Sequence, residues 1–175
     1  MKFKQFVLAI ALPVLSGVAF AANSPDVLDD LEIAHVAYTA DNIDIQYAHL
    51  ALAISQNPDV REFAKTMIRD HEAVNAQALA LLEKLNATAQ DNFLSQALLA
   101  GAEKIIDELT ALRGAEFDRR YAQNELAYHK AVNDLVGNTF IPNIDNAEVK
   151  SLFEAGLEIF KVHERHAQMM VNQLQ

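Results

Sequence analysis

Apolar residues recur in alternating steps of three and four along nearly the whole chain. One such stripe runs from Ile33 through Val36, Ala40 and Ile43 to Tyr47. This spacing places apolar side chains on one face of an α-helix, and no stretch shows the two-residue alternation typical of strands. The pattern therefore predicts an all-α protein. Its five expected helices span residues 25–55, 58–86, 93–112, 115–137 and 146–173.

Capping residues indicate where these helices begin. Ser24 and Asn57 each stand directly before a proline, the order typical of an N-cap followed by the first helical residue. Asp145 has an acidic residue three positions later, which predicts a capping box at the start of the last helix. We expect Gly114 to end the third helix, and residues 137–143, which include a proline, to form a loop.

The third helix decides the expected topology. At about 1.5 Å per residue, it is long enough to carry the chain back along the other helices. We therefore expect an up-down four-helix bundle with an extra crossover helix. A five-helix array with a different packing order is the alternative.

Residues 1–21 have the features of a secretory signal peptide. Two lysines precede an apolar run over residues 6–15, and Ala19-Phe20-Ala21 gives the small-x-small pattern that signal peptidase reads. The apolar run is too short to span a bilayer as a helix. We therefore expect a protein exported to a bacterial periplasm, with residues 22–175 forming one mature domain. An uncleaved membrane anchor is the alternative.

The mature chain is strongly acidic. The whole sequence has 14 basic and 24 acidic residues, and cleavage removes two of the lysines, which brings the formal charge to −12. We expect no nucleic acid as a partner, because such a surface repels it, whereas a cation or a basic protein of the envelope is compatible. Cysteine is absent from the sequence, which excludes thiolate metal sites and covalently attached haem. No segment of the mature chain has the roughly 20 apolar residues that a membrane span requires.

Polar residues interrupt the apolar stripes of four helices at one height. Counted from a common end of the bundle, the levels of Asp44, His71, Glu125, His129 and His163 agree to within about one helical turn, roughly 5 Å. His71, Glu125 and His163 lie within their stripes, and the other two lie at stripe edges. We therefore expect these five side chains to converge in the middle of the bundle.

Two interpretations of this polar level are open. Buried polar groups are unfavourable unless they are paired, so the level can be a hydrogen-bonded layer that fixes the register of the helices. It can also be a metal site, because three imidazoles and two carboxylates suit zinc, copper, nickel or iron. In the second interpretation, the metal ligands come from Asp44, His71, Glu125, His129 and His163.

Several stretches with a characteristic spacing resemble one protein family. The sequence is similar, over nearly the whole mature chain, to the exported bacterial proteins known as domain of unknown function 4142. The matching elements are Asn57–Ala64, Met67–His71 with Asn75, Gly114–Tyr121, His129 and His163. Asp44 stands where that family usually has glutamate, and Glu158 stands where it often has proline. The resemblance implies a ferritin-like fold and no established activity. Members are often described as outer-membrane proteins. The resemblance therefore also implies a position peripheral to the outer membrane.

Di-iron enzymes of the wider ferritin-like class use a Glu-x-x-His pair on each of two helices. Here the residues three positions before the candidate histidines are Ile68, Leu126 and Phe160. A ferroxidase-type centre therefore does not match this sequence, and a single-ion site or none matches better. A metal-dependent oxidoreductase is the weakest of the three functions considered, after a metal-binding protein and a structural or interaction protein of the envelope.

We predict export with cleavage after Ala21. N-terminal sequencing of the protein isolated from the producing cell is expected to start at Ala22. A protein that keeps Met1 and fractionates with membranes would contradict the prediction.

Overall fold

The computed structural model describes residues 24–175, so the expected signal peptide and its cleavage site lie outside the described residues. Every regular element in the described part is helical, which confirms the all-α class. The long helices are α1 (Asp30–Ile54), α2 (Pro58–Lys84), α3 (Phe93–Ala111), α4 (Gly114–Leu135) and α6 (Ala147–Gln173). Three short elements complete the fold: η1 (Pro25–Val27), η2 (Val136–Phe140) and α5 (Ile141–Asn143).

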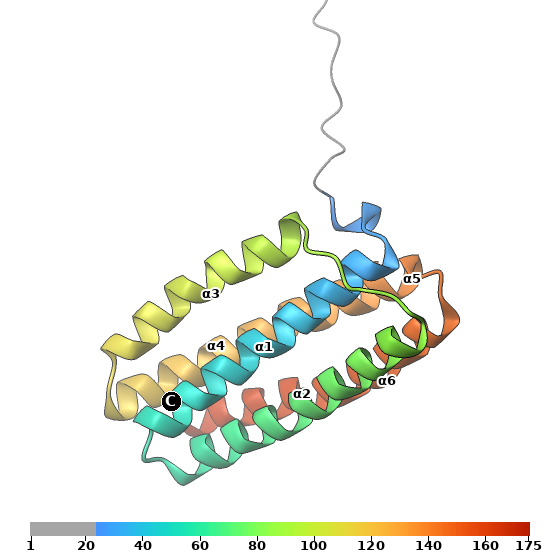
Figure 1. Cartoon of the computed structure of the whole chain (residues 1–175). Coiled ribbons are helices and arrows are strands. Elements are labelled where there is room, and N and C mark those ends of the chain that lie inside the picture. The colour runs from blue at the N-terminus through green and yellow to red at the C-terminus, as the bar shows by residue number, and fades with distance from the viewer. Residues whose placement is uncertain (1–23) are drawn as a thin grey trace, which may run out of the picture.

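Four long helices form the bundle, and α3 lies along its outside (Figure 1). The helix α1 packs against α2 and α4, and α6 packs against the same two helices. Neighbouring helices therefore run antiparallel around the bundle. The helix α3 packs mainly on α1 and returns the chain to the end where α1 meets α2, so the crossover is as predicted. No helix within residues 24–175 has the length and apolar character needed to cross a membrane.

The first helix begins later than predicted. Ser24 makes no capping hydrogen bond with its side chain, and Pro25 opens only the short 3-10 turn η1. Instead, Asp29 caps α1: its carboxylate accepts from the backbone N–H groups of Leu31 and Glu32, and the Glu32 carboxylate accepts from the Asp29 N–H. This reciprocal capping box supplies acceptors for otherwise unpaired N–H groups, which explains the start at Asp30.

The N-cap of the last helix is one residue later than predicted. Asn146, rather than Asp145, accepts hydrogen bonds from the N–H groups of Glu148 and Val149. The backbone N–H groups of Asp145 and Asn146 both donate to the carboxylate of Asp30 on α1. The start of α6 is thus tied to the start of α1, and that contact fixes which residue caps the helix.

Two other expected boundaries were wrong. Residues 137–143 do not form a loop: α4 continues into the π-helical turn η2 and the short helix α5. Gly114 begins α4 rather than ending α3, which stops at Ala111. Its φ of +56° lies in the left-handed region that favours glycine, so the reversal between α3 and α4 depends on this residue.

The core consists of two separate apolar clusters. The upper cluster, near the turn between α1 and α2, includes Tyr47, Met67 and Phe117. The lower cluster, near η2 and the start of α6, includes Ile33 and Phe140. Each of the four bundle helices contributes at least one buried polar residue to the region between the clusters. We call that region the polar layer; it consists of Asp41, Asp44, His71, Glu125, His129 and His163.

The corrected N-cap of α6 can be tested by alanine substitution. Asn146→Ala is expected to lower the free energy of unfolding by about 1 kcal/mol, because two N–H groups of α6 lose their acceptor. Asp145→Ala is the matched control, since the side chain of Asp145 is exposed and does not cap the helix. Urea unfolding measures both. A larger loss for Asp145→Ala would favour Asp145 as the capping residue.

Candidate metal centre

The five residues predicted to share one level do converge in the structure. Asp44 comes from α1, His71 from α2, Glu125 and His129 from α4, and His163 from α6. Each is at most 4% exposed, although all five side chains are polar or ionisable. The other three histidines of the sequence lie outside the polar layer.

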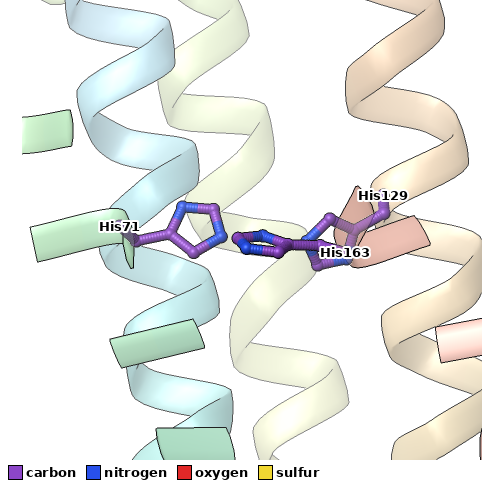
Figure 2. A group of neighbouring side chains, drawn as sticks. All are labelled: His71, His129 and His163. Carbon is purple, nitrogen blue, oxygen red and sulfur yellow. The ribbon is translucent and has the colours of Figure 1, made fainter. Parts of the chain in front are cut away.

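The imidazoles of His71, His129 and His163 face one another across the bundle (Figure 2). Their ring centroids are 5.4 Å apart for His71 and His163, 5.5 Å for His129 and His163, and 5.9 Å for His71 and His129. One nitrogen of each ring lies within 4.8 Å of one nitrogen of each of the other two. Three helices therefore place three nitrogen donors around one point.

Each of these imidazoles is held in place through one of its two ring nitrogens. Nδ1 of His71 lies 2.8 Å from the carboxylate of Asp41, and Nδ1 of His129 lies 2.9 Å from the backbone carbonyl of Glu125. Nε2 of His163 lies 3.0 Å from the carboxylate of Asp70. Backing of one ring nitrogen by a carboxylate or carbonyl orients the ring and fixes which nitrogen is available as a ligand.

The second nitrogens of His129 (Nε2) and His163 (Nδ1) are buried without a hydrogen-bond partner. The second nitrogen of His71, Nε2, instead lies 2.7 Å from the carboxylate of Asp44. Buried polar atoms almost always have partners, so two unpartnered nitrogens in one place require an explanation. A shared ligand that accepts nitrogen lone pairs supplies one.

Carboxylates border the imidazoles on the side of the upper cluster. Oδ2 of Asp44 lies 2.7 Å from Nε2 of His71 and 3.9 Å from Nε2 of His129. Oε2 of Glu125 lies 3.8 Å from Nδ1 of His129, and neither carboxyl oxygen of Glu125 has a hydrogen-bond partner. Asp44, Glu125 and His129 form a second group with one potential ligand atom each within 4.8 Å. The two groups share His129.

The charges in the polar layer are set by His71 and its two aspartates. Burial by itself lowers the pKa of the His71 imidazole, but the carboxylates of Asp44 and Asp41 outweigh this effect and raise the pKa to about 10. Burial by itself raises the pKa of Asp44, yet the positive charge of His71 outweighs it and holds that pKa well below its usual range. Without a metal, the layer thus contains an imidazolium between two carboxylates.

The remaining ionisable groups of the layer are neutral near pH 7. Burial lowers the pKa of His129, and it lowers the pKa of His163 to about 4. Burial raises the pKa of Glu125 well above its usual range, and the negative charge of Asp44 acts in the same direction. Burial also raises the pKa of Asp41, although its hydrogen bond to His71 acts in the opposite direction. The positive charge of His71 is therefore paired chiefly with the carboxylate of Asp44.

Sequence reasoning missed the residues that orient the imidazoles. Asp41 lies three positions before Asp44, so its place on the same face of α1 was a usable signal. Asp70 directly precedes His71 in the sequence, but its carboxylate bonds to His163 on α6. This contact depends on the packing of α2 against α6, so the position of Asp70 in the sequence does not reveal it. Phe160 stacks on the His71 ring, with ring centroids 4.6 Å apart. Asp118, nearer the start of α4 than the layer, accepts a hydrogen bond from the hydroxyl of Ser55.

Residues 16–170 match the protein family described as Domain of unknown function (DUF4142). The chain belongs to this family. That membership confirms the resemblance seen in the sequence. A search of curated proteins found no match.

A solved structure described as "CopM in the Cu(II)-bound form" shares the fold of this DUF4142 member. The TM-score is 0.64 at 13% sequence identity, and the match covers 85% of this chain and 99% of the other. At this identity, the likeness supports the helical fold alone.

The histidines of the polar layer predict a stability maximum near pH 6.5 for the metal-free protein. Below that pH, the unfolded chain protonates His129 and His163, whose folded-state pKa values are depressed. Each of these histidines contributes a loss of about 1 kcal/mol per pH unit as the pH drops. Glu125, whose raised pKa keeps its proton only in the folded state, offsets part of this slope. Above pH 6.5, only the folded state keeps the proton on His71, up to a pKa of about 10, so stability falls again as the pH rises.

Chemical unfolding in chelator between pH 5 and 9 measures this dependence. His163→Asn removes one depressed histidine, so the slope on the acid side is expected to decrease by about 1 kcal/mol per pH unit. An unchanged acid slope in that variant would contradict the assignment.

Proposed function

We propose that this protein is an exported, periplasmic helical-bundle protein of the cell envelope that binds one transition-metal ion in its polar layer. His71, His129 and His163 supply nitrogen ligands, and Asp44 supplies an oxygen ligand. Glu125 borders the ion and is available as a further ligand. One observation carries the proposal: three buried imidazoles converge with one nitrogen each within 4.8 Å of the others, and a nitrogen of His129 and a nitrogen of His163 lack any hydrogen-bond partner.

The alternative is a layer that only fixes helix register, in a structural or interaction protein of the envelope. The contact of His71 with Asp41 and Asp44 favours it, because this ion pair needs no metal. The ion pair does not account for the unpartnered nitrogens of His129 and His163, nor for the two unpartnered oxygens of Glu125. Leaving such groups unpaired costs about 1–3 kcal/mol each. A bound cation gives the nitrogens a partner, which favours the metal site over the alternative.

Three imidazoles with a carboxylate form a ligand set suited to zinc, copper, nickel or iron. The similar fold of the Cu(II)-bound CopM structure supports testing copper(II) first. Divalent copper also binds most nitrogen and oxygen sites more tightly than the other divalent ions of its row.

The proposed compartment follows from the signal-peptide features of residues 1–21 and the acidic mature chain. A position peripheral to the outer membrane, reached through an envelope protein partner, fits the same features. We assign no enzymatic reaction, because Glu-x-x-His pairs are absent around the three histidines of the layer.

Copper(II) binding tests the proposal. The purified mature protein is expected to bind one Cu(II) per chain in equilibrium dialysis and to be stabilised as the ion is added. At a free ion concentration 100 times Kd, the gain in free energy of unfolding is about 2.7 kcal/mol. Zinc, nickel and iron(II) are compared under the same conditions.

A matched pair of variants on α6 identifies the site. His163→Ala removes a buried ligand and is expected to abolish the stabilisation by metal. His166→Ala removes an exposed imidazole one turn away on the same helix and is expected to retain it. If none of the four metals stabilises the wild type, while His163→Ala still lowers its stability in chelator, the register layer is the correct interpretation.

A further inference from the structure

Directly below the polar layer, the bundle contains a cavity of about 170 Å³. Its wall is almost entirely apolar and comes from all five long helices. Five aromatic rings contribute to this wall: Tyr38, Tyr128, Phe140, Phe153 and Phe160. An engineered cavity of about 150 Å³ in another protein binds benzene, so the volume here suits a single aromatic ring.

Small side chains create this space. Ala37 and Ala40 on α1, Ala78 on α2 and Gly156 on α6 all line the cavity. A Cβ atom added at Gly156 would make only ordinary contacts, 3.7 Å to Phe160 and 3.9 Å to Val74. Unfilled apolar space weakens a core. The position of this cavity beside a buried polar side chain therefore points to a ligand.

A buried amide provides that polar anchor. Asn75 lines the cavity one helical turn below His71, and its side chain is 7% exposed. Its Oδ1 atom has no hydrogen-bond partner. The carboxylate of Asp41 is already bonded to His71, and the hydroxyl of Tyr128 already donates to the carbonyl of Ala40. The amide of Asn75 is therefore the group that a polar ligand atom would meet.

We propose that this cavity binds a small monocyclic aromatic molecule with one hydroxyl group, of the size and chemistry of phenol. The ring occupies the apolar space between the aromatic side chains, and the hydroxyl hydrogen-bonds to Asn75. A hydroxyl both donates and accepts, so it can pair with either end of the amide. This binding site is separate from the proposed metal site and does not require a metal.

The two sites share a wall. Phe160 lines the cavity and stacks on the His71 ring, and Asp41 lines the cavity and bonds to the same ring. A bound aromatic ring therefore contacts the side chains that hold His71 in position. Its binding is expected to shift the imidazole NMR signals of His71, whereas those of the exposed His49 remain in place.

Titration of the metal-free protein with phenol and with benzene tests the proposal, with isothermal calorimetry as the readout. Phenol is expected to bind one molecule per chain, about fivefold more tightly than benzene, since one net hydrogen bond is worth about 1 kcal/mol. Asn75→Ala is expected to remove this preference. Failure of both compounds to bind would overturn the proposal, and equal affinity in the wild type would overturn the role of Asn75.

Two leucine substitutions on α2 form a matched pair. Ala78→Leu fills the cavity and is expected to weaken phenol binding at least tenfold, as a misfit of a few carbon atoms does in apolar pockets. Ala80→Leu adds the same side chain at an exposed position and is expected to leave binding unchanged. Gly156→Ala is the milder filling variant if Ala78→Leu does not fold. Phenol binding that survives both filling variants would place the ligand elsewhere and overturn the proposal.

Discussion

The ion pair between His71 and the two aspartates of α1 is the interaction on which the polar layer depends. Removing charged groups from water is strongly unfavourable, and an imidazolium between two carboxylates offsets that penalty only when all three groups are in place. The pair joins α2 to α1 at one height, because Asp41 and Asp44 lie about one turn apart on α1. A shift of either helix by one residue would leave a buried charge without its partner. The ion pair thus ties together, at one height, two of the helices that contribute the proposed metal ligands.

The same arrangement is compatible with a metal-free state of the polar layer and with a metal-bound one. In the metal-free state, the proton on His71 balances one of the two carboxylates. A metal ion that binds Nε2 of His71 must displace this proton, because the lone pair of that nitrogen forms the bond. The hydrogen bonds of His129 and His163 use the ring nitrogen that the proposed ion would not need, so binding would require little rearrangement of these two rings.

Most of the fold could be predicted from the sequence because it depends on periodicity. Apolar stripes repeated over many turns indicate five helices, and the length of α3 requires the crossover. Helix ends were less predictable because tertiary contacts decide them. The carboxylate of Asp30 reaches across to the start of α6, and no local pattern at Asp145 contains that information.

The candidate site, like the fold, could be predicted only in part from the sequence. Heights along helices follow from residue counts, so the convergence of Asp44, His71, Glu125, His129 and His163 could be expected. The partners of the imidazoles could not, because they depend on the rotation of each helix about its own axis. Asp70 illustrates this point: it neighbours His71 in sequence, yet it bonds to His163 on another helix.

The polar layer divides the apolar core into two clusters that differ in the number of apolar residues they bury. The lower cluster has fewer fully buried apolar residues than the upper cluster, and it borders the cavity. Local opening of a protein requires least free energy where the fewest apolar contacts are lost, so the lower half is the part that opens first. Such opening exposes one side of the layer while the upper half stays folded. The rate at which an ion enters or leaves this buried site is therefore governed by the packing of the lower half, and amide hydrogen exchange there reports it.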